Sequence, residues 1–339
     1  MEQSKLPMIE LHLHLDGAIP PETMWALAQE KGVPMPAETL EGFQHWLVET
    51  SDCADVNTYL ARFELPLQLM QDAPSIARVT KDLMTELSRQ GHIYDEIRFA
   101  PQLHRREGLT QRQAIEAVLE GRRQALAENP GYDAGILLCA MCIGPETVNM
   151  AENLETVRLA KEFLGRGVVG ADLAGAEGIV PLQSFHPVFD LARELGVPAT
   201  CHAGDSQGPD TVRDALSFGV RRIGHGHHIY DEPSLWEPAI ARGVTLEICP
   251  TSNIQCHTQP SYREHPAKKL LDAGLRLCIS TDNMTLAAVS LADEYRHCVE
   301  DMGLTPEDLG KMLVFAAEAA FLPEEKKQKL VARVREALS

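Results

Sequence analysis

Eight short apolar runs alternate with longer stretches of helical periodicity, and this alternation constrains the fold more than any other feature of the chain. Near-continuous apolar runs are typical of parallel strands that are covered on both faces. Eight strand–helix units in succession predict an α/β fold, a (β/α)8 or TIM barrel, rather than an open sheet. The expected strands are residues 8–14, 93–101, 135–142, 168–175, 198–204, 222–226, 245–250 and 276–282.

The rest of this 339-residue chain is expected to be helical in two further places. Segments 20–31, 37–49, 56–70 and 74–89 show helical periodicity, which predicts a helical insertion (about residues 20–90) after the first strand, over the mouth of the barrel. Extra C-terminal helices are expected because Thr305-Pro306 offers an N-cap followed by proline, and 324–338 is amphipathic. No Gly/Ser/Pro-rich linker divides the chain, so residues 1–339 are expected to form a single domain.

Composition and charge exclude several classes of function. Hydrophobic residues make up 44% of the chain and charged residues 24%, which is typical of a globular protein and excludes overall disorder. The 49 acidic and 31 basic residues give a net charge of -18, which would repel nucleic acids and anionic membranes. No leader peptide or membrane-spanning run is expected, and the eight scattered cysteines fit buried thiols. We therefore expect a cytoplasmic protein that binds a small neutral molecule.

Histidine and aspartate residues fall at the predicted carboxyl ends of several strands. His12 and His14 end the first strand, His202 the fifth, His225 the sixth and Asp282 the eighth. Barrel enzymes build their active sites at this end, where side chains from different strands converge. Residues two apart in a strand point the same way, so His12 and His14 can face one metal ion. Three imidazoles and a carboxylate suit one Zn²⁺ per chain, with Fe²⁺ or Mn²⁺ less favoured.

Two further residues are expected to act beside such a metal. His225 could orient or deprotonate a metal-activated water, and Asp205, just beyond His202, could carry a proton to and from a substrate. Strand alternation lets His225 and His227 share a face, so spacing alone does not choose between them. Each residue alone has an ordinary structural explanation, such as a hydrogen-bonded histidine or a helix-capping aspartate. Their combined placement at four strand ends is what favours a metal site.

Seven segments make the chain resemble the adenosine deaminases of the metal-dependent amidohydrolase superfamily over essentially its whole length. Any one segment alone would be a weak signal, but all seven occur in order and at the expected strand ends. They are ELHLHLDGAI (10–19), IRFAPQ (97–102), VVGADLAGAEG (168–178), CHAGD (201–205), RIGHGHH (222–228), ICPTSN (248–253) and ISTDN (279–283).

The resemblance implies zinc-dependent hydrolytic deamination of adenosine, and by extension of 2′-deoxyadenosine, to inosine and ammonia in purine salvage. It also implies a role for each matching residue. By resemblance, the zinc ligands are His12, His14, His202 and Asp282. The catalytic residues would be Asp205, which protonates purine N1, and His225, which orients the attacking water. The substrate-binding residues would be His14, Asp16 (ribose 5′-hydroxyl), Gly175 (purine N3), Asn283 (purine N7), Tyr59 and Phe63. Tyr59 and Phe63 share a helical stripe with Val56 and Leu60 that resembles the apolar gate of the family, and ordinary core packing also accounts for such a stripe.

Two positions depart from the family pattern. The usual HAGE is HAGD here, so Asp205 is one methylene shorter, and a misplacement of about 1 Å at a reacting centre can cost on the order of 100-fold in rate. The common Asp-Asp pair is Asp282-Asn283, whose amide can donate a hydrogen bond to N7.

Asp16 bears on the substrate. Relatives that act on adenine or aminodeoxyfutalosine tend to carry Glu at this position, and Asp favours a nucleoside with a free 5′-hydroxyl. A carboxylate there would also repel a 5′-phosphate, which disfavours AMP. Two alternatives stay open: a deaminase of a related aminopurine (adenine, aminodeoxyfutalosine or a modified adenosine), and a catalytically silent zinc protein that binds purines. The sequence leaves the oligomeric state open.

Overall fold

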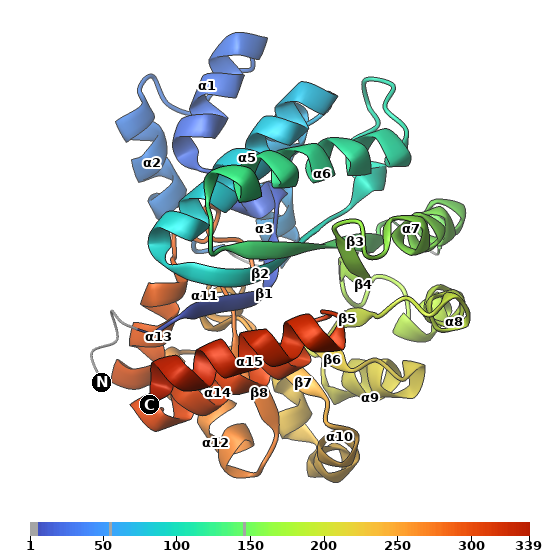
Figure 1. Cartoon of the computed structure of the whole chain (residues 1–339), viewed down its shortest axis with the longest axis vertical. Helices are drawn as coiled ribbons and strands as arrows, with labels where there is room; N and C mark the ends of the chain where they lie inside the picture. Colours follow the sequence, from blue (N-terminus) through green and yellow to red (C-terminus); the bar gives the residue numbers. More distant parts are fainter. Residues whose placement is uncertain (1–5, 54–55, 145–146) are drawn as a thin grey trace.

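The computed structural model describes residues 6–53, 56–144 and 147–339, and these residues contain eight parallel strands (Figure 1). The strands form two four-stranded sheets with the orders β1-β2-β3-β4 and β5-β6-β7-β8, so neighbours in sequence are neighbours in space. The strands are β1 (Met8–His14), β2 (His92–Phe99), β3 (Asp133–Cys142), β4 (Val168–Gly175), β5 (Thr200–Ala203), β6 (Arg222–His225), β7 (Thr245–Ile248) and β8 (Arg276–Ile279).

The two sheets join at both edges into a closed barrel. At one seam, Ala171 of β4 forms a parallel bridge with Ala199, which precedes β5. At the other seam, Leu13 of β1 bridges Asp282, which follows β8, and the N–H of His14 donates to the carbonyl of Asp282 at 2.8 Å. The predicted (β/α)8 barrel is therefore confirmed, and every expected strand is present with ends that shift by a few residues at most.

Helices cover the outside of the barrel, and one continuous apolar core fills the space between them and the strands. Helices α6, α13 and α14 each begin at a capping box, and the α14 cap, Thr305 followed by Pro306, is the one that the sequence predicts. Helix α14 packs on β8, β1 and β7, and α15 packs on α14 (Figure 1). These helices are α6 (Gln111–Glu128), α7 (Met150–Phe163), α8 (His186–Leu195), α9 (Pro209–Phe218), α10 (Trp236–Arg242), α11 (Pro250–Gln255), α12 (Ala267–Asp272), α13 (Leu291–Glu300), α14 (Pro306–Ala319) and α15 (Glu324–Leu338). Among the described helices, none combines the length and apolar character that crossing a bilayer needs.

Among the described residues between β1 and β2 there are five α-helices: α1 (Pro21–Lys31), α2 (Leu40–Glu49), α3 (Val56–Ala61), α4 (Glu64–Leu69) and α5 (Ala73–Gln90). Helix α5 packs on α6 and β2, as an ordinary crossover helix does, so the extra helices are α1 to α4. The single helix expected over 56–70 is two helices. Pro66 explains the break, because a proline ring clashes with the carbonyl four residues earlier and is tolerated only in the first turn of a new helix.

Charged side chains from four strands pair inside the barrel. Arg222 donates from Nε to Glu247 (2.6 Å) and from a terminal nitrogen to Glu96 (2.5 Å). Arg98 donates to Glu247 (2.7 Å) and to Asp172 (2.8 Å). All five side chains are buried. Burying a charge is costly unless it is paired, so this network holds only as a set.

Removal of one member should therefore destabilise the whole barrel. We expect Arg222→Ala to lower the free energy of unfolding by about 3–5 kcal/mol, because Glu96 would remain buried without its cation and Glu247 would keep only Arg98. Arg335→Ala is the matched control, since Arg335 is exposed and pairs with Glu318 at the surface (3.1 Å), and it should cost less than about 1 kcal/mol. Denaturant unfolding of both variants measures the difference, and equal losses would contradict a stabilising role for the network.

Candidate metal centre and active site

Three histidines and one aspartate converge at the carboxyl end of the barrel. Ligand atoms of His12, His14, His202 and Asp282 all lie within 4.8 Å of one another. The Nε2 atoms of His14 and His202 are 3.2 Å apart, and Oδ1 of Asp282 lies 3.3 Å from Nε2 of both His12 and His14. The structure thus brings together residues from β1, β5 and the end of β8 that are far apart in sequence.

The chemistry of this cluster fits a divalent metal ion. Nε2 of His12 is buried and has no hydrogen-bond partner among the described residues, which leaves a lone pair directed into the cluster. Burial lowers the pKa of His14 well below its usual value, so the ring is neutral and can bind a cation. Burial opposes ionisation of Asp282, but the neighbouring His12 and His14 outweigh it and hold the carboxyl pKa well below its usual value.

A second ring of buried charges orients these ligands. Oε2 of Glu247 lies 2.8 Å from Nδ1 of His12, and Oδ2 of Asp172 lies 3.0 Å from Nδ1 of His202. Arg98 joins the two carboxylates from inside the barrel. A carboxylate on the far nitrogen fixes the tautomer of a metal-binding histidine and leaves its Nε2 free for the metal.

Two residues of the site adopt backbone conformations that side chains rarely allow. His225 has φ 58° and Asp282 has φ 64°, both in the left-handed region. Such conformations persist only where the surroundings impose them, and they concentrate at functional sites. At Asp282 the barrel seam imposes it, and the Ser252 hydroxyl fixes the side chain by donating to Oδ2 at 2.7 Å.

The structure places His225, not His227, beside the cluster. The rings of His225 and His12 are 4.9 Å apart between centroids. Gly226 follows in the left-handed region (φ 70°), which ends the strand alternation, so His227 lies instead against His265 (5.7 Å between centroids). Burial lowers the pKa of His225 to about 3, so this ring is neutral.

Asp205 follows β5 and lies next to His225, with 3.6 Å between its Oδ1 and the ring Nδ1. Oδ1 also accepts hydrogen bonds from Nδ2 of Asn253 (2.7 Å) and from the hydroxyl of Thr258 (3.1 Å). Burial, together with the negative charge of Asp282, raises the pKa of Asp205 to about 6. Its carboxyl group can therefore exchange a proton near neutral pH.

The loop that carries Asp205 is held by the carboxylate of Glu177. Glu177 accepts hydrogen bonds from the backbone N–H groups of residues 204–207 at 2.7–3.1 Å and from the Thr211 hydroxyl at 2.6 Å. Successive backbone N–H groups that point at one anion form a nest. This nest fixes the backbone from which the short Asp205 side chain extends.

A cavity of about 360 Å³ opens beside the metal ligands. Its lining includes His14, Asp16, Leu60, Phe63, Met141 and Gly175, and among the described residues it includes no lysine or arginine. The Phe63 ring faces His14 edge-on, 6.5 Å between centroids. Tyr59 lies behind Phe63 (6.1 Å between ring centroids), packed with Cys53 and Cys256. The side chain of Val56 lies outside the described residues.

Two glycines, Gly175 in the cavity lining and Gly17 beside Asn283, allow close approaches that a larger residue would prevent. Gly175 ends β4 with φ 108°, and a Cβ there would lie 2.4 Å from the carbonyl oxygen of Cys142. A Cβ on Gly17 would lie 1.9 Å from Oδ1 of Asn283. Asn283 is buried directly after the ligand Asp282, so the absence of a side chain at Gly17 sets its position.

The family model for adenosine deaminase matches residues 7–337 of the chain.
The chain belongs to the adenosine deaminase family.
It is 38% identical to an adenosine deaminase of Haemophilus ducreyi over 97% of this chain and 96% of that protein, and 36% identical to one of Enterococcus faecalis over 96% of each. Among solved structures, an N6-mAMP deaminase of Arabidopsis matches with TM-score 0.86 and 28% identity over 99% of this chain and 100% of that one. An adenine deaminase of Arthrobacter aurescens shares the fold with TM-score 0.87 and 22% identity over 98% and 99% of the two chains.

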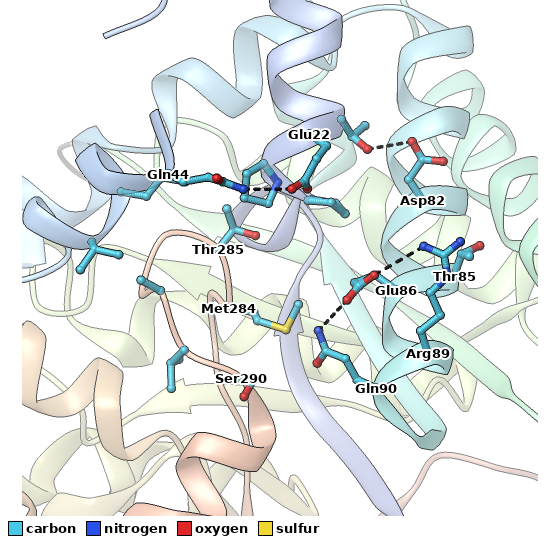
Figure 2. Close-up of a pocket in the computed structure, with 17 residues that line it drawn as sticks. Glu22, Gln44, Asp82, Thr85, Glu86, Arg89, Gln90, Met284, Thr285 and Ser290 are labelled. Carbon is cyan, nitrogen blue, oxygen red and sulfur yellow. Dashed lines mark hydrogen bonds and ion pairs between the residues drawn. The ribbon is translucent and has the colours of Figure 1, made fainter. Parts of the chain in front are cut away.

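A larger cavity, of about 790 Å³, has none of the candidate metal ligands in its lining. Figure 2 shows its lining residues. Helices α1, α2 and α5 and residues 284–290 line it. Several of its polar side chains form hydrogen bonds with one another. Glu22 accepts a hydrogen bond from Gln44 (2.9 Å), and Glu86 accepts one from Gln90 (3.1 Å), as Figure 2 shows. Cavity volume therefore does not indicate which cavity belongs to the candidate active site, whereas the converging histidines and aspartate do.

Sequence reasoning missed the residues that hold the site in place: Asp172, Glu247, Arg98, Glu177 and Asn253. Asp172 and Glu247 each interrupt an apolar strand run, and a charge in such a run must find a buried partner. That signal could have marked them. Glu177 and Asn253 act through loops that only the folded chain brings together, and no local pattern indicates them.

We expect Asp172→Asn to weaken metal binding by about 10- to 100-fold, because the amide no longer provides a charged acceptor for His202. Titration calorimetry of the metal-free protein with Zn²⁺ measures this. Asp190→Asn is the control, since Asp190 pairs with Arg193 on the exposed face of α8. Equal affinities of the two variants would show that Asp172 does not support the metal ligands.

We expect Gly17→Ala to reduce the free energy of unfolding by about 1–3 kcal/mol, because the new methyl group must displace Asn283. Gly208→Ala provides the control, since a Cβ there meets nothing within 4 Å and the backbone φ of -75° suits alanine. Thermal or denaturant unfolding compares the two. A Gly17→Ala variant as stable as the control would refute the close approach.

Proposed function

We propose that this protein catalyses the zinc-dependent hydrolytic deamination of adenosine, and of 2′-deoxyadenosine, to inosine and ammonia. One observation carries the proposal: a metal-ligand cluster, a protonatable carboxyl at Asp205 and a neutral imidazole at His225 lie together beside a cavity whose described lining contains no lysine or arginine. The adenosine deaminases that it resembles over almost its whole length support the same reaction.

We propose one Zn²⁺ per chain, held by His12, His14, His202 and Asp282. Three imidazole nitrogens and one carboxylate oxygen suit zinc among the divalent metals. When bound, zinc supplies a nucleophile at neutral pH by lowering the pKa of water to about 7.

Asp205 then transfers protons, and His225 orients the attacking water. Asp205 donates a proton to purine N1, which draws electrons from the ring and makes C6 electrophilic. Water adds to C6, and its oxygen stays as the carbonyl of inosine. One proton of the water goes to N6, the C6–N6 bond breaks and ammonia leaves, while the other proton restores the protonated form of Asp205. His225 orients the attacking water and stabilises the charge that develops on its oxygen. Asp205 must be protonated to act, and its raised pKa keeps part of the population in that form near neutral pH.

The cavity favours a neutral nucleoside over a nucleotide. Asp16 lies in the lining without a lysine or arginine among the described lining residues, so a 5′-phosphate would meet a carboxylate and no cation. We assign Asp16 to the ribose 5′-hydroxyl, Gly175 to purine N3 and Asn283 to N7. Phe63, with Tyr59 behind it, forms an apolar wall of the cavity.

We also propose that residues 1–339 act as one barrel domain in the cytoplasm. The described cysteines are buried in the fold, so the structure does not depend on an oxidising compartment.

A related aminopurine is the second candidate substrate, because Asp205 is one methylene shorter than the glutamate usual in the family. The shorter side chain would suit a purine that lies deeper in the cavity. A substrate panel separates the candidates: adenosine, 2′-deoxyadenosine, adenine, aminodeoxyfutalosine and N6-methyladenosine. The readout is release of ammonia, or of methylamine in the case of N6-methyladenosine.

We expect zinc-loaded protein to turn over adenosine faster than adenine, aminodeoxyfutalosine and N6-methyladenosine, and kcat/KM to fall as the pH rises above about 6. The rate constant falls because Asp205 is active only in its protonated form, and the protonated fraction decreases as the pH rises above its pKa. Asp205→Asn should reduce kcat by about 100- to 10,000-fold and abolish this limb of the pH profile.

Asp205→Glu is the informative control. Fast turnover by the unchanged protein, with no gain from Glu, would mean that the shorter carboxylate is well placed. Negligible turnover of adenosine that Glu restores would overturn adenosine as the substrate and favour another aminopurine.

A further inference from the structure

One fully buried amide, Asn253 of α11, lies between the two groups that the proposed function assigns to proton transfer and water orientation. Its Nδ2 is 2.7 Å from Oδ1 of Asp205 and 3.1 Å from Nδ1 of His225. An amide nitrogen carries two hydrogens, so it can donate one to each group. A single side chain thus connects an acid that follows β5 with an imidazole that ends β6.

His265 sets the orientation of this amide from the other side. Its Nδ1 accepts from the backbone N–H of Ala267 (3.2 Å), and its Nε2 lies 3.2 Å from Oδ1 of Asn253. Burial lowers the pKa of His265 to about 3, so the ring is neutral and its one proton is on Nε2. A flipped Asn253 amide would set two donors against each other at His265, and would turn its oxygen toward the carboxylate of Asp205.

The hydrogen-bond donor of Asn253 also determines the tautomer of His225. Because Asn253 donates to Nδ1 of His225, that nitrogen must accept, and the proton of the ring must be on Nε2. The rings of the metal ligands His12 and His202 lie 4.9 and 5.5 Å away, between centroids. Nε2–H is therefore the one donor that His225 can offer to water or substrate.

The direction of Asp205 is fixed in the same way. The bonds from Asn253 and Thr258 both go to Oδ1. Oδ2 is then the oxygen that can carry the transferred proton, because Oδ1 already accepts two hydrogen bonds. A carboxylate that is shorter than the family's glutamate needs this fixed direction, since a small misplacement at the reacting atoms has a large kinetic cost.

We propose that Asn253, oriented by His265, is a positioning residue that holds the proton of His225 on Nε2 and aims Oδ2 of Asp205 at the substrate. The chain of hydrogen bonds starts at the backbone N–H of Ala267 and runs through both side chains to the reacting groups. This proposal rests on the proposed function, which supplies the roles of Asp205 and His225.

Nitrogen NMR of isotope-labelled histidine in the zinc-loaded protein tests the tautomer directly. The unchanged protein should show His225 protonated on Nε2, with its signals identified by their loss in His225→Gln. Asn253→Asp replaces the donor with an acceptor, so it should move the proton to Nδ1. An unchanged tautomer in Asn253→Asp would overturn the proposal, and so would a proton on Nδ1 in the unchanged protein.

Kinetics of two His265 variants provide a second test that a merely structural role would not pass. His265→Gln keeps an N–H donor near Nε2, whereas His265→Leu removes it. We expect Gln to retain most of kcat and Leu to lose about 100-fold, with zinc content unchanged and KM changed less than kcat. Asn129→Asp, at the C-terminal end of α6, is the control for the new charge of Asn253→Asp, and it should leave both kcat and the His225 tautomer unchanged. Equal kcat for the Gln and Leu variants would refute the positioning role.

The two tests also separate this proposal from the proposed function. If the unchanged protein fails to deaminate adenosine, the proposed function fails, and the tautomer measurement still decides the role of Asn253. If adenosine is deaminated but the tautomer is indifferent to Asn253, only the positioning role fails.

Discussion

The guanidinium of Arg98 is the link between the interior of the barrel and the metal ligands. It pairs with Asp172 and Glu247, and these carboxylates contact His202 and His12. In a low-dielectric interior a carboxylate stays ionised only beside a cation, and Arg98 supplies that cation to Asp172 and shares this role with Arg222 at Glu247. The orientation of two metal ligands therefore depends on charge pairing below the site. This is why a barrel interior that would otherwise be filled with apolar side chains contains a connected set of charges.

The site combines rigid and adaptable parts. The metal ligands, His225 and Asp282 lie on strand ends, where hydrogen bonds and two left-handed residues fix the backbone. Part of the apolar lining of the cavity comes from elsewhere: Leu60 lies in α3 and Phe63 directly precedes α4, both between β1 and β2. This part of the cavity is thus formed by a layer of the fold that contributes no residue to the metal cluster. Changes in the helical layer can alter which purine fits without disturbing the ligand set.

Much of this arrangement could be predicted from sequence because it follows periodic patterns. Continuous apolar runs gave the strands, and histidines and aspartates at their carboxyl ends gave a cluster that the barrel does assemble. The pattern did not foresee the break before Pro66, because one steric clash there overrides a long amphipathic period. It also could not choose between His225 and His227, since that choice depends on the left-handed turn at Gly226. Glu177 and Asn253, which hold the site in place, were missed for a different reason. They form hydrogen bonds with residues that lie far away in the sequence, Asp205 and His225, and no local pattern indicates such contacts.

Asp282 contributes to the structure in two ways, through its backbone and through its side chain. Its backbone closes the seam between β1 and β8, and its side chain belongs to the metal cluster. Because the other ligands His12 and His14 stand on β1, an ion bound there fastens the first strand of the barrel to the last. Metal occupancy and closure of the barrel are then thermodynamically linked, since whatever binds the closed form alone stabilises it by mass action. An ion held by this candidate cluster would connect the first and last strands of the barrel, and its removal would weaken that one seam first.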